Sequence, residues 1–136
     1  MKIKIKIKVL VCCFALCAFA FSCEDTAQSE VIMVSAEEMQ ELLELEDVQL
    51  VDLRTPEEYK TGFIEHAQNI DYTSPTFDED LVLLDKSKPI MVYCKSGGRS
   101  GKCSKKLKDA GFEKVYDLEG GIAKWKFSGN EIKTQN

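Results

Sequence analysis

Cys94 is the residue around which the chemistry of this chain is organised. It follows a short apolar run, residues 90–93, whose β-branched and aromatic side chains are typical of a buried strand. Two adjacent glycines, Gly97 and Gly98, come next and let the backbone turn tightly enough for successive N–H groups to point at one spot. Helical spacing begins directly afterwards, so the unpaired N–H groups and the positive dipole end of a helix face the same spot. A thiol in such a field ionises readily, and the thiolate is the reactive nucleophile.

The sequence therefore predicts that Cys94 is a catalytic nucleophile in an anion-binding loop. A lone cysteine after a buried strand is ordinarily an inert small hydrophobe. The order of a strand, a cysteine, paired glycines, an arginine and a helix favours the reactive interpretation instead. The residues that we expect to surround the bound anion are Lys95, Ser96, Gly97, Gly98, Arg99 and Ser100. For Arg99, pairing inward with a carboxylate and shaping the loop is an open alternative to contact with the substrate.

Strands that alternate with helices must position this loop. The expected strands are residues 31–34, 49–53, 68–70, 90–93 and 115–118, and the expected helices are residues 36–45, 56–60, 78–84, 98–110 and 121–127. Capping signals mark two of the helix starts, Ser35 with Glu38 and Thr55 with Glu58. The pattern predicts an α/β fold with a mainly parallel central sheet flanked by helices. Ligands of such sheets bind beyond the carboxyl ends of the strands, where Cys94 is expected.

Four other residues could bear on the site. Asp52 and Arg54 lie at the end of a neighbouring strand, where we expect a charge pair that holds the loops. His66 is the only histidine, and its place in a turn favours a surface role over that of a base for Cys94. Cys103 falls in the first turns of the helix after the loop, and a disulfide with Cys94 is an open alternative to packing against the sheet. We expect no metal site.

Residues 1–22 have the pattern of a secretory signal peptide. Four lysines among residues 1–8 precede a 13-residue apolar stretch, residues 9–21, which is short for a membrane span. Ala20 to Cys23 then resemble the lipid-attachment motif of bacterial lipoproteins, although Ala20 departs from its commonest form. We expect lipidation of Cys23, with ordinary cleavage or a retained anchor as alternatives. The expected divisions are a signal peptide (1–22), a lipid-attachment cysteine and tether (23–30), a domain (31–130) and a polar tail that frays (131–136).

Charge excludes some classes of partner. Without residues 1–22 the chain carries 14 basic and 23 acidic residues, a formal net charge of −9. Such a surface does not favour nucleic acid or anionic lipid headgroups. We therefore expect no nucleic-acid partner and membrane association only through a lipid on Cys23. We also expect an exported monomer on the periplasmic side.

Four segments together resemble the single-domain rhodaneses. They are VDLRTPEEY (51–59), GFIEHAQNI (62–70), VYCKSGGRS (92–100) and LEGGIAKW (118–125). They occur in the family's order and spacing, within residues 35–129. The resemblance implies a rhodanese-like three-layer fold and a sulfurtransferase. In that activity Cys94 carries a persulfide between two half-reactions, and residues 94–99 form the active-site loop.

The chemistry of the residues agrees with this implication. A thiolate at Cys94 can attack the outer sulfur of thiosulfate and expel sulfite, much as in thiol–disulfide exchange. The ring of N–H groups stabilises the anionic donor and then the persulfide. A thiol, cyanide or protein acceptor then removes the sulfur, and the expected reaction needs no metal or organic cofactor.

Other functions stay open at this stage. A cysteine phosphatase or arsenate reductase places five residues between nucleophile and arginine, whereas this chain has four between Cys94 and Arg99. The shorter loop favours sulfur over a tetrahedral oxyanion. A membrane-anchored binding or sensing module is disfavoured because such modules often lose the cysteine. A sulfur carrier that serves a partner protein would use the same persulfide and has the same sequence pattern.

Overall fold

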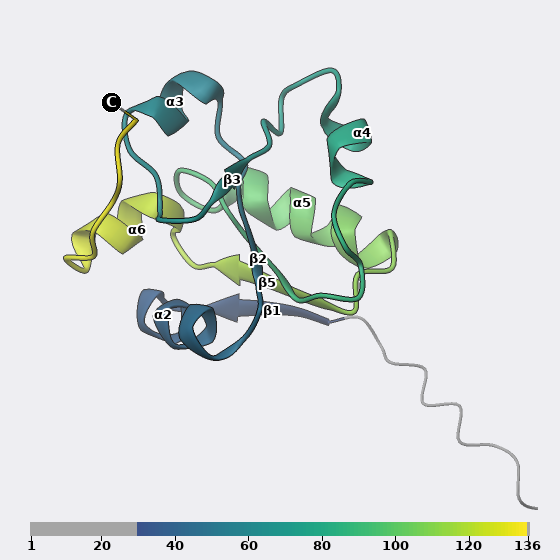
Figure 1. Ribbon diagram of the computed structural model, residues 1–136, viewed down its shortest axis with the longest axis horizontal. Coiled ribbons are helices and arrows are strands. Elements are labelled where there is room, and N and C mark those ends of the chain that lie inside the picture. The colour runs from purple at the N-terminus through teal and green to yellow at the C-terminus, as the bar shows by residue number, and fades with distance from the viewer. Residues whose placement is uncertain (1–29, 136) are drawn as a thin grey trace, which may run out of the picture.

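The computed structural model describes residues 30–135 of the 136-residue chain (Figure 1). Five strands alternate with five helices along this part of the chain. The strands are β1 (Glu30–Val34), β2 (Gln49–Asp52), β3 (Gln68–Asn69), β4 (Ile90–Tyr93) and β5 (Lys114–Leu118). The helices are α2 (Ala36–Leu45), α3 (Pro56–Lys60), α4 (Phe77–Leu81), α5 (Gly98–Asp109) and α6 (Gly121–Phe127).

The strands form one parallel sheet in the order β1-β5-β4-β2-β3, with β4 at its centre. Every pairing between these strands is parallel, which confirms the predicted fold class. Parallel neighbours need a crossover connection, and helices supply these connections on the two faces of the sheet. The central place of β4 explains why all four of its residues are buried.

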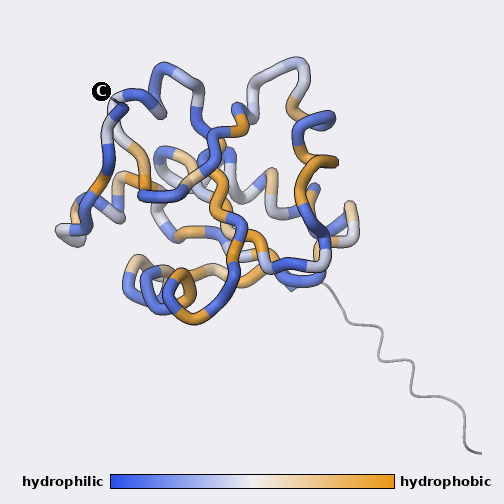
Figure 2. Tube along the Cα trace, in the orientation of Figure 1, coloured by the Kyte–Doolittle hydropathy of each residue, from blue (hydrophilic) through white to orange (hydrophobic). Residues whose placement is uncertain are grey.

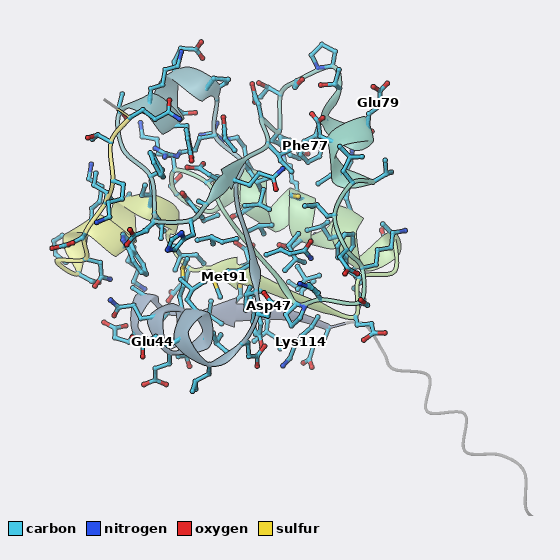
Figure 3. All side chains as sticks on the ribbon, in the orientation of Figure 1. Glu44, Asp47, Phe77, Glu79, Met91 and Lys114 are labelled. Atoms are coloured by element: carbon cyan, nitrogen blue, oxygen red, sulfur yellow. The ribbon has the colours of Figure 1, made fainter. Side chains whose placement is uncertain are left out.

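Alternation along β4 builds two cores, one on each face of the sheet. Ile90, Val92 and Cys94 belong to the core that α4 and α5 cover, whereas Met91 and Tyr93 belong to the core that α2 and α6 cover. The apolar segments converge on the sheet in Figure 2, and Phe77 and Met91, which Figure 3 labels, come from the two different cores. A sheet that is buried on both faces needs two layers of helices, so the fold has three layers.

Both predicted capping boxes are present. The Ser35 hydroxyl accepts from the Glu38 N–H at 3.2 Å, and the Glu38 carboxylate accepts from the Ser35 N–H at 2.8 Å. Thr55 and Glu58 make the same reciprocal pair at the start of α3, at 3.3 and 3.0 Å. Each box satisfies two N–H groups that a helix start leaves unpaired, which fixes where α2 and α3 begin.

The predicted helix over residues 78–84 is too long. Regular α-helix ends at Leu81, and the next turn is tighter, because the Leu83 and Leu84 N–H groups donate to Asp80 and Leu81. The tighter turn points Leu84 into the core and leaves Val82 and Leu83 exposed. Apolar spacing alone could not distinguish these two turns.

The expectation that the chain frays after Asn130 is wrong for residues 131–133. Lys133 and Phe63 exchange two backbone hydrogen bonds of 2.8 Å, an isolated antiparallel bridge. Ile132 packs against the core that contains Trp125, and the Trp125 indole donates to the Glu131 carbonyl at 2.9 Å. These contacts hold the segment after α6 beside the turn that precedes β3.

The expected signal peptide and the lipidation of Cys23 lie outside the described residues, as does the tether up to residue 29. Glu30, the last residue assigned to the tether, is the first residue of β1. From residue 30 to residue 135, no helix is long and apolar enough to cross a membrane.

Candidate active site

Cys94 stands directly after β4, at the carboxyl end of the central strand. Its side chain is buried, with 2 % of the residue exposed. The first turn of α6 holds the backbone of the loop, since the Ile122 N–H donates to the Cys94 carbonyl at 2.9 Å and the Ala123 N–H donates to the Lys95 carbonyl at 3.1 Å. The loop is therefore fixed from below by β4 and from the side by α6.

Backbone and hydroxyl groups of the loop converge on the Cys94 sulfur, as predicted from the paired glycines. The Gly97 N–H donates to Sγ at 3.1 Å, and the Ser100 Oγ lies 3.7 Å from Sγ. Gly97 can place its N–H there because its φ is 105°, in the left-handed region that favours glycine. Helix α5 begins at the next residue, Gly98, so the positive end of its dipole also faces the sulfur.

These contacts favour the thiolate. Burial of the Cys94 thiol opposes ionisation, but hydrogen bonds from the Ser100 amide and hydroxyl and from the Gly97 and Ser96 amides outweigh it, so the pKa of Cys94 lies below its ordinary value. The other described cysteine, Cys103, is fully buried in α5, and burial raises its pKa to about 12. Both cysteines are free thiols. Of these two described cysteines, Cys94 is the one whose surroundings favour a nucleophilic thiolate.

Arg99 faces a carboxylate. Its two terminal nitrogens donate to the Glu58 oxygens at 2.7 and 2.9 Å, a bidentate pair across the mouth of the loop. The pair raises the pKa of Arg99, with a smaller contribution from the sulfur of Cys94, and lowers the pKa of Glu58 to about 2. Arg99 thus ties the loop to α3 while its charge stays close to Cys94.

The remaining loop residues divide by exposure. Lys95, Ser96 and Gly98 are exposed, where a ligand can reach them. Ser100, which we expected to contact the bound anion, is fully buried, and its hydroxyl lies between the sulfur and the Gly97 carbonyl at 3.3 Å. The position of Ser100 is therefore better suited to stabilising the Cys94 thiolate than to contacting a sulfur donor.

The predicted charge pair of Asp52 and Arg54 is present and buried. Arg54 Nη2 and Asp52 Oδ2 are 2.6 Å apart, and Arg54 Nε contacts both carboxylate oxygens. Arg54 also donates to the carbonyls of Glu58, at 3.2 Å, and Gly62, at 2.6 Å. The pair therefore anchors α3 and the turn after it, and through Glu58 it fixes the partner of Arg99.

Sequence reasoning missed the second role of Glu58. The sequence marks Glu58 only as a capping residue, yet its carboxylate both caps α3 and pairs with Arg99, 41 positions away. The sequence did contain a hint of this second role, because a carboxylate that caps a helix through one oxygen can accept hydrogen bonds from a cation through the other. The contact depends on the packing of α3 beside the loop, which the local pattern does not specify.

Asp117 is a second residue that the sequence did not single out. It is 1 % exposed and lies beneath α5, where the side chains of Ser100 and Ser104 favour its ionised form. Burial raises its pKa, and Oδ1 has no hydrogen-bond partner in the described part of the chain. The sequence shows only that Asp117 lies near the end of an expected strand; the pairing of β5 with β4, which brings it to the loop, is seen only in the structure.

His66 makes no hydrogen bond with Cys94 in the described part of the chain, which agrees with the surface role expected from its place in a turn. It is exposed and has a φ of 66°, the one non-glycine residue between 30 and 135 with positive φ. Among these residues, no three histidine, cysteine or acidic side chains are grouped so that they could hold a metal ion.

A groove of about 450 Å³ opens beside the loop, between α3 and α6. Glu57 and Thr61 line it from α3 and its C-cap, and Ile122, Ala123 and Lys126 line it from α6. Lys95, the residue after Cys94, also lines the groove. The arrangement combines a buried, ionisable sulfur with an open groove beside its loop.

The comparison with known families decides the identity of this fold. The family described as "Rhodanese-like domain" matches residues 35–128, which include the loop, α3 and α6. The chain belongs to the rhodanese-like family. This confirms the resemblance drawn from the four sequence segments.

Two curated relatives illustrate the range of this family. The uncharacterized protein YqhL of Bacillus subtilis is 34% identical over 87 residues, 64% of this chain and 65% of that protein. The tRNA uridine(34) hydroxylase of Photorhabdus laumondii is 36% identical over 98 residues, 68% of this chain but 27% of that enzyme. The chain thus spans less than two thirds of the length of both.

Solved rhodanese-like structures match most of the described chain. A rhodanese-related protein of Thermoplasma volcanium superposes with a TM-score of 0.69 at 26% identity, over 76% of this chain and 99% of that one. The polysulfide-sulfur transferase homodimer of Wolinella succinogenes gives 0.66 at 29% identity, over 81% and 83% of the two chains. These neighbours confirm the rhodanese-like three-layer fold.

Gly121 shows how closely α6 supports the loop, and it gives a direct test. A Cβ at Gly121 would lie 2.4 Å from the Cys94 carbonyl oxygen and 2.8 Å from the Lys95 carbonyl, both backbone atoms that cannot swing away. We expect Gly121→Ala to destabilise the fold by about 2–4 kcal/mol and to slow alkylation of Cys94 about tenfold or more, because the loop must shift.

Gly129→Ala is the matched control for that variant. Gly129 also has a positive φ, 82°, but a Cβ there meets nothing within 4 Å. It should cost only the backbone strain, about 1 kcal/mol, and leave Cys94 reactivity unchanged. Urea unfolding and iodoacetamide kinetics measure both effects. Equal losses in the two variants would show that α6 does not hold the loop.

Proposed function

We propose that this protein is a sulfurtransferase of the thiosulfate type, in which Cys94 carries the sulfur as a persulfide. The observation that carries the proposal is the buried Cys94 sulfur with the Gly97 amide at 3.1 Å and a lowered pKa. Membership of the rhodanese-like family supports it. So does the similarity, at 29% identity, to a polysulfide-sulfur transferase, which makes polysulfide an alternative donor to thiosulfate.

In the first half-reaction the Cys94 thiolate attacks the outer sulfur of thiosulfate. A new S–S bond forms to Cys94, the S–S bond of thiosulfate breaks, and its electron pair leaves with sulfite. The charge balances, because a thiolate and a dianion become a persulfide anion and the sulfite dianion. The Gly97 amide, the end of α5 and the charge of Arg99 stabilise the anion throughout.

In the second half-reaction the acceptor takes the outer sulfur. Cyanide attacks the persulfide anion directly and leaves as thiocyanate, while a thiolate attacks the protonated persulfide and leaves as a new persulfide. In both cases the S–S bond to Cys94 breaks and the electron pair returns to the Cys94 sulfur. The same hydrogen bonds that lower the pKa of Cys94 make its thiolate a good leaving group. The proposed cycle uses no metal and no organic cofactor.

The mass of the intact protein tests this proposal. Treatment with thiosulfate should add one sulfur atom, released on addition of cyanide, and peptide mapping should locate it on Cys94. Cys103→Ser should load as the wild type does, because Cys103 is fully buried. An aryl phosphate should not be hydrolysed. Failure to gain sulfur from either thiosulfate or polysulfide, or turnover of the aryl phosphate, would contradict the proposal.

The pH dependence of Cys94 alkylation follows from its pKa. Because the thiolate reacts and the pKa of Cys94 is lowered, the alkylation rate should rise with pH and level off at a lower pH than for free cysteine. As pH falls through that pKa, the sulfur takes up a proton and the rate is lost. Iodoacetamide kinetics between pH 5 and 10, with free cysteine as the reference, measure the midpoint. A midpoint at or above that of free cysteine would show that the loop does not favour the thiolate.

We further propose that the protein is exported and anchored by a lipid on Cys23, with the domain as a monomer on the periplasmic side. The support is the sequence pattern of residues 1–23. The mass of the mature N-terminal peptide tests it: a diacylated Cys23 is expected, and a peptide that begins elsewhere without lipid would overturn it.

A further inference from the structure

Asp117 is a buried carboxyl group that takes no part in the two proposed half-reactions. Its Oδ1 has no hydrogen-bond partner among residues 30–135, and it belongs to none of the ion pairs found in that part of the chain. A buried carboxylate that lacks both a cation and a full set of donors is costly. The site therefore favours the neutral acid.

The elements packed around Asp117 bring no cation to it. In the sheet it is in register with Met33 of β1 and Val92 of β4. Helix α5 covers it closely, since a Cβ at Gly101 would lie 3.7 Å from Asp117 Oδ2. Cys103 of the same helix is titratable and is affected by the charge of Asp117, but burial raises the pKa of Cys103 to about 12. Cys103 is therefore a neutral neighbour in the range where Cys94 ionises.

The hydroxyl groups that face Asp117 from α5 have no hydrogen to spare. Ser104 Oγ donates to the Ser100 carbonyl at 2.9 Å. Ser100 Oγ lies 3.3 Å from the Gly97 carbonyl oxygen and 3.7 Å from Cys94 Sγ. A hydroxyl has one hydrogen and two lone pairs. An ionised Asp117 would compete for the single hydrogen of Ser100, whereas a protonated Asp117 brings a hydrogen of its own.

We infer that Asp117 is a positioning residue of the active site: as a neutral acid it donates to Ser100 Oγ, which leaves the Ser100 hydrogen for the Cys94 thiolate. A hydroxyl that accepts on one side is also a stronger donor on the other. An ionised Asp117 would do the reverse, because it would draw the same hydrogen and repel the thiolate. The inference rests on the proposed function only in taking Cys94 as the sulfur carrier, and its tests need no sulfur transfer.

The protonation state of Asp117 can be read from the NMR shifts of aspartate carboxyl carbons in the full chain. The resonance of Asp117 is the one that disappears in Asp117→Asn. It should titrate at a higher pH than the exposed aspartates, because burial raises the pKa of Asp117. It should also keep the shift of the neutral acid at the pH where half of Cys94 is ionised. Titration together with the exposed aspartates would overturn the inference.

Two substitutions of Asp117 separate its charge from its hydrogen bond. Asp117→Asn cannot ionise but can still donate, so the pH midpoint of Cys94 alkylation by iodoacetamide should be kept and the rate at pH 7 should stay within about twofold of the wild type. Asp117→Leu cannot donate, so the midpoint should rise and the rate at pH 7 should fall about three- to tenfold, as expected for the loss of one hydrogen bond. In a Ser100→Ala background, Asp117→Leu should have no further effect, because the connecting hydroxyl is gone.

Val115→Ala is the matched control for stability. Val115 is fully buried, lies on the same face of β5 two residues before Asp117 and packs in the core that α5 covers. Its truncation should lower the melting temperature through a cavity and leave the midpoint of Cys94 alkylation unchanged.

Three outcomes of the alkylation experiments would overturn the inference. A lower midpoint in Asp117→Asn would show that Asp117 is ionised and opposes the thiolate. Equal shifts in Asp117→Leu and Val115→Ala would show a role in stability alone, and an effect of Asp117→Leu that persists without the Ser100 hydroxyl would exclude the proposed link. If Asp117→Leu does not fold, Asp117→Asn and the carboxyl shifts still decide. Sulfur loading is a separate reading by mass, so its failure beside the expected midpoints would contradict the proposed function and leave the role of Asp117 standing.

Discussion

Replacing Cys94 by serine should abolish sulfur loading and lower turnover with thiosulfate by about 10³-fold or more, as expected when a covalent nucleophile is lost. A serine hydroxyl is not ionised by the hydrogen bonds that suffice for a thiol, and oxygen cannot form the persulfide. The loop has only one such sulfur, because Cys103 is fully buried and burial raises its pKa to about 12. The intact mass after thiosulfate and the rate of thiocyanate formation measure the loss.

Two controls separate chemistry from folding in that experiment. Serine is close in size to cysteine, so Cys94→Ser should melt within a few degrees of the wild type, and Cys103→Ser should keep both loading and turnover. Retention of sulfur by Cys94→Ser, mapped to another cysteine, would contradict the assignment of the nucleophile. A large fall in melting temperature would require Cys94→Ala as a second variant, for which the same loss of loading is expected.

The arrangement of β4, the loop and α5 could be predicted from the sequence because it is local. The apolar run 90–93, the paired glycines and the helical spacing after them each depend on neighbours in the chain, and the structure places β4 and α5 within one residue of the expected bounds. The Asp52–Arg54 pair is equally local, since its members are two positions apart. Local patterns of this kind specify a strand, a turn or a helix start without any information about distant parts of the chain.

Contacts between distant segments could not be predicted in the same way. The Glu58–Arg99 pair joins residues 41 positions apart, and Asp117 reaches the loop only because β5 pairs with β4 in the sheet order. The docking of residues 131–133 beside Phe63 depends likewise on the approach of α6 to the turn before β3. None of these three contacts produces a periodic pattern in the sequence, because each depends on how helices and strands pack against one another after they have formed.

Arg54→Met should lower the free energy of unfolding by about 3–5 kcal/mol, the largest loss of stability that we expect from a single charged residue. The change leaves the Asp52 carboxylate, which is fully buried, without its cation. It also removes donors from the carbonyls of Glu58 and Gly62. Since α3 carries Glu58, the loss should loosen the partner of Arg99 and slow Cys94 alkylation as well. Urea unfolding at pH 7 gives the stability, and iodoacetamide kinetics give the reactivity.

The controls for Arg54→Met distinguish a buried charge from the mere loss of an ion pair. Lys88→Met breaks an exposed pair with Asp47, whose side chain is 83% exposed, and should lower the free energy of unfolding far less than Arg54→Met does. The double variant Asp52→Asn with Arg54→Met removes both charges, keeps an acceptor for the Arg54 position's own N–H, and should recover part of the lost stability. If the double variant were as unstable as the sum of the two single variants, the unpaired carboxylate could not be the cause. In that case the lost hydrogen bonds to α3 and the turn at Gly62 would account for the effect, and the pair would matter to the site mainly through the position of Glu58.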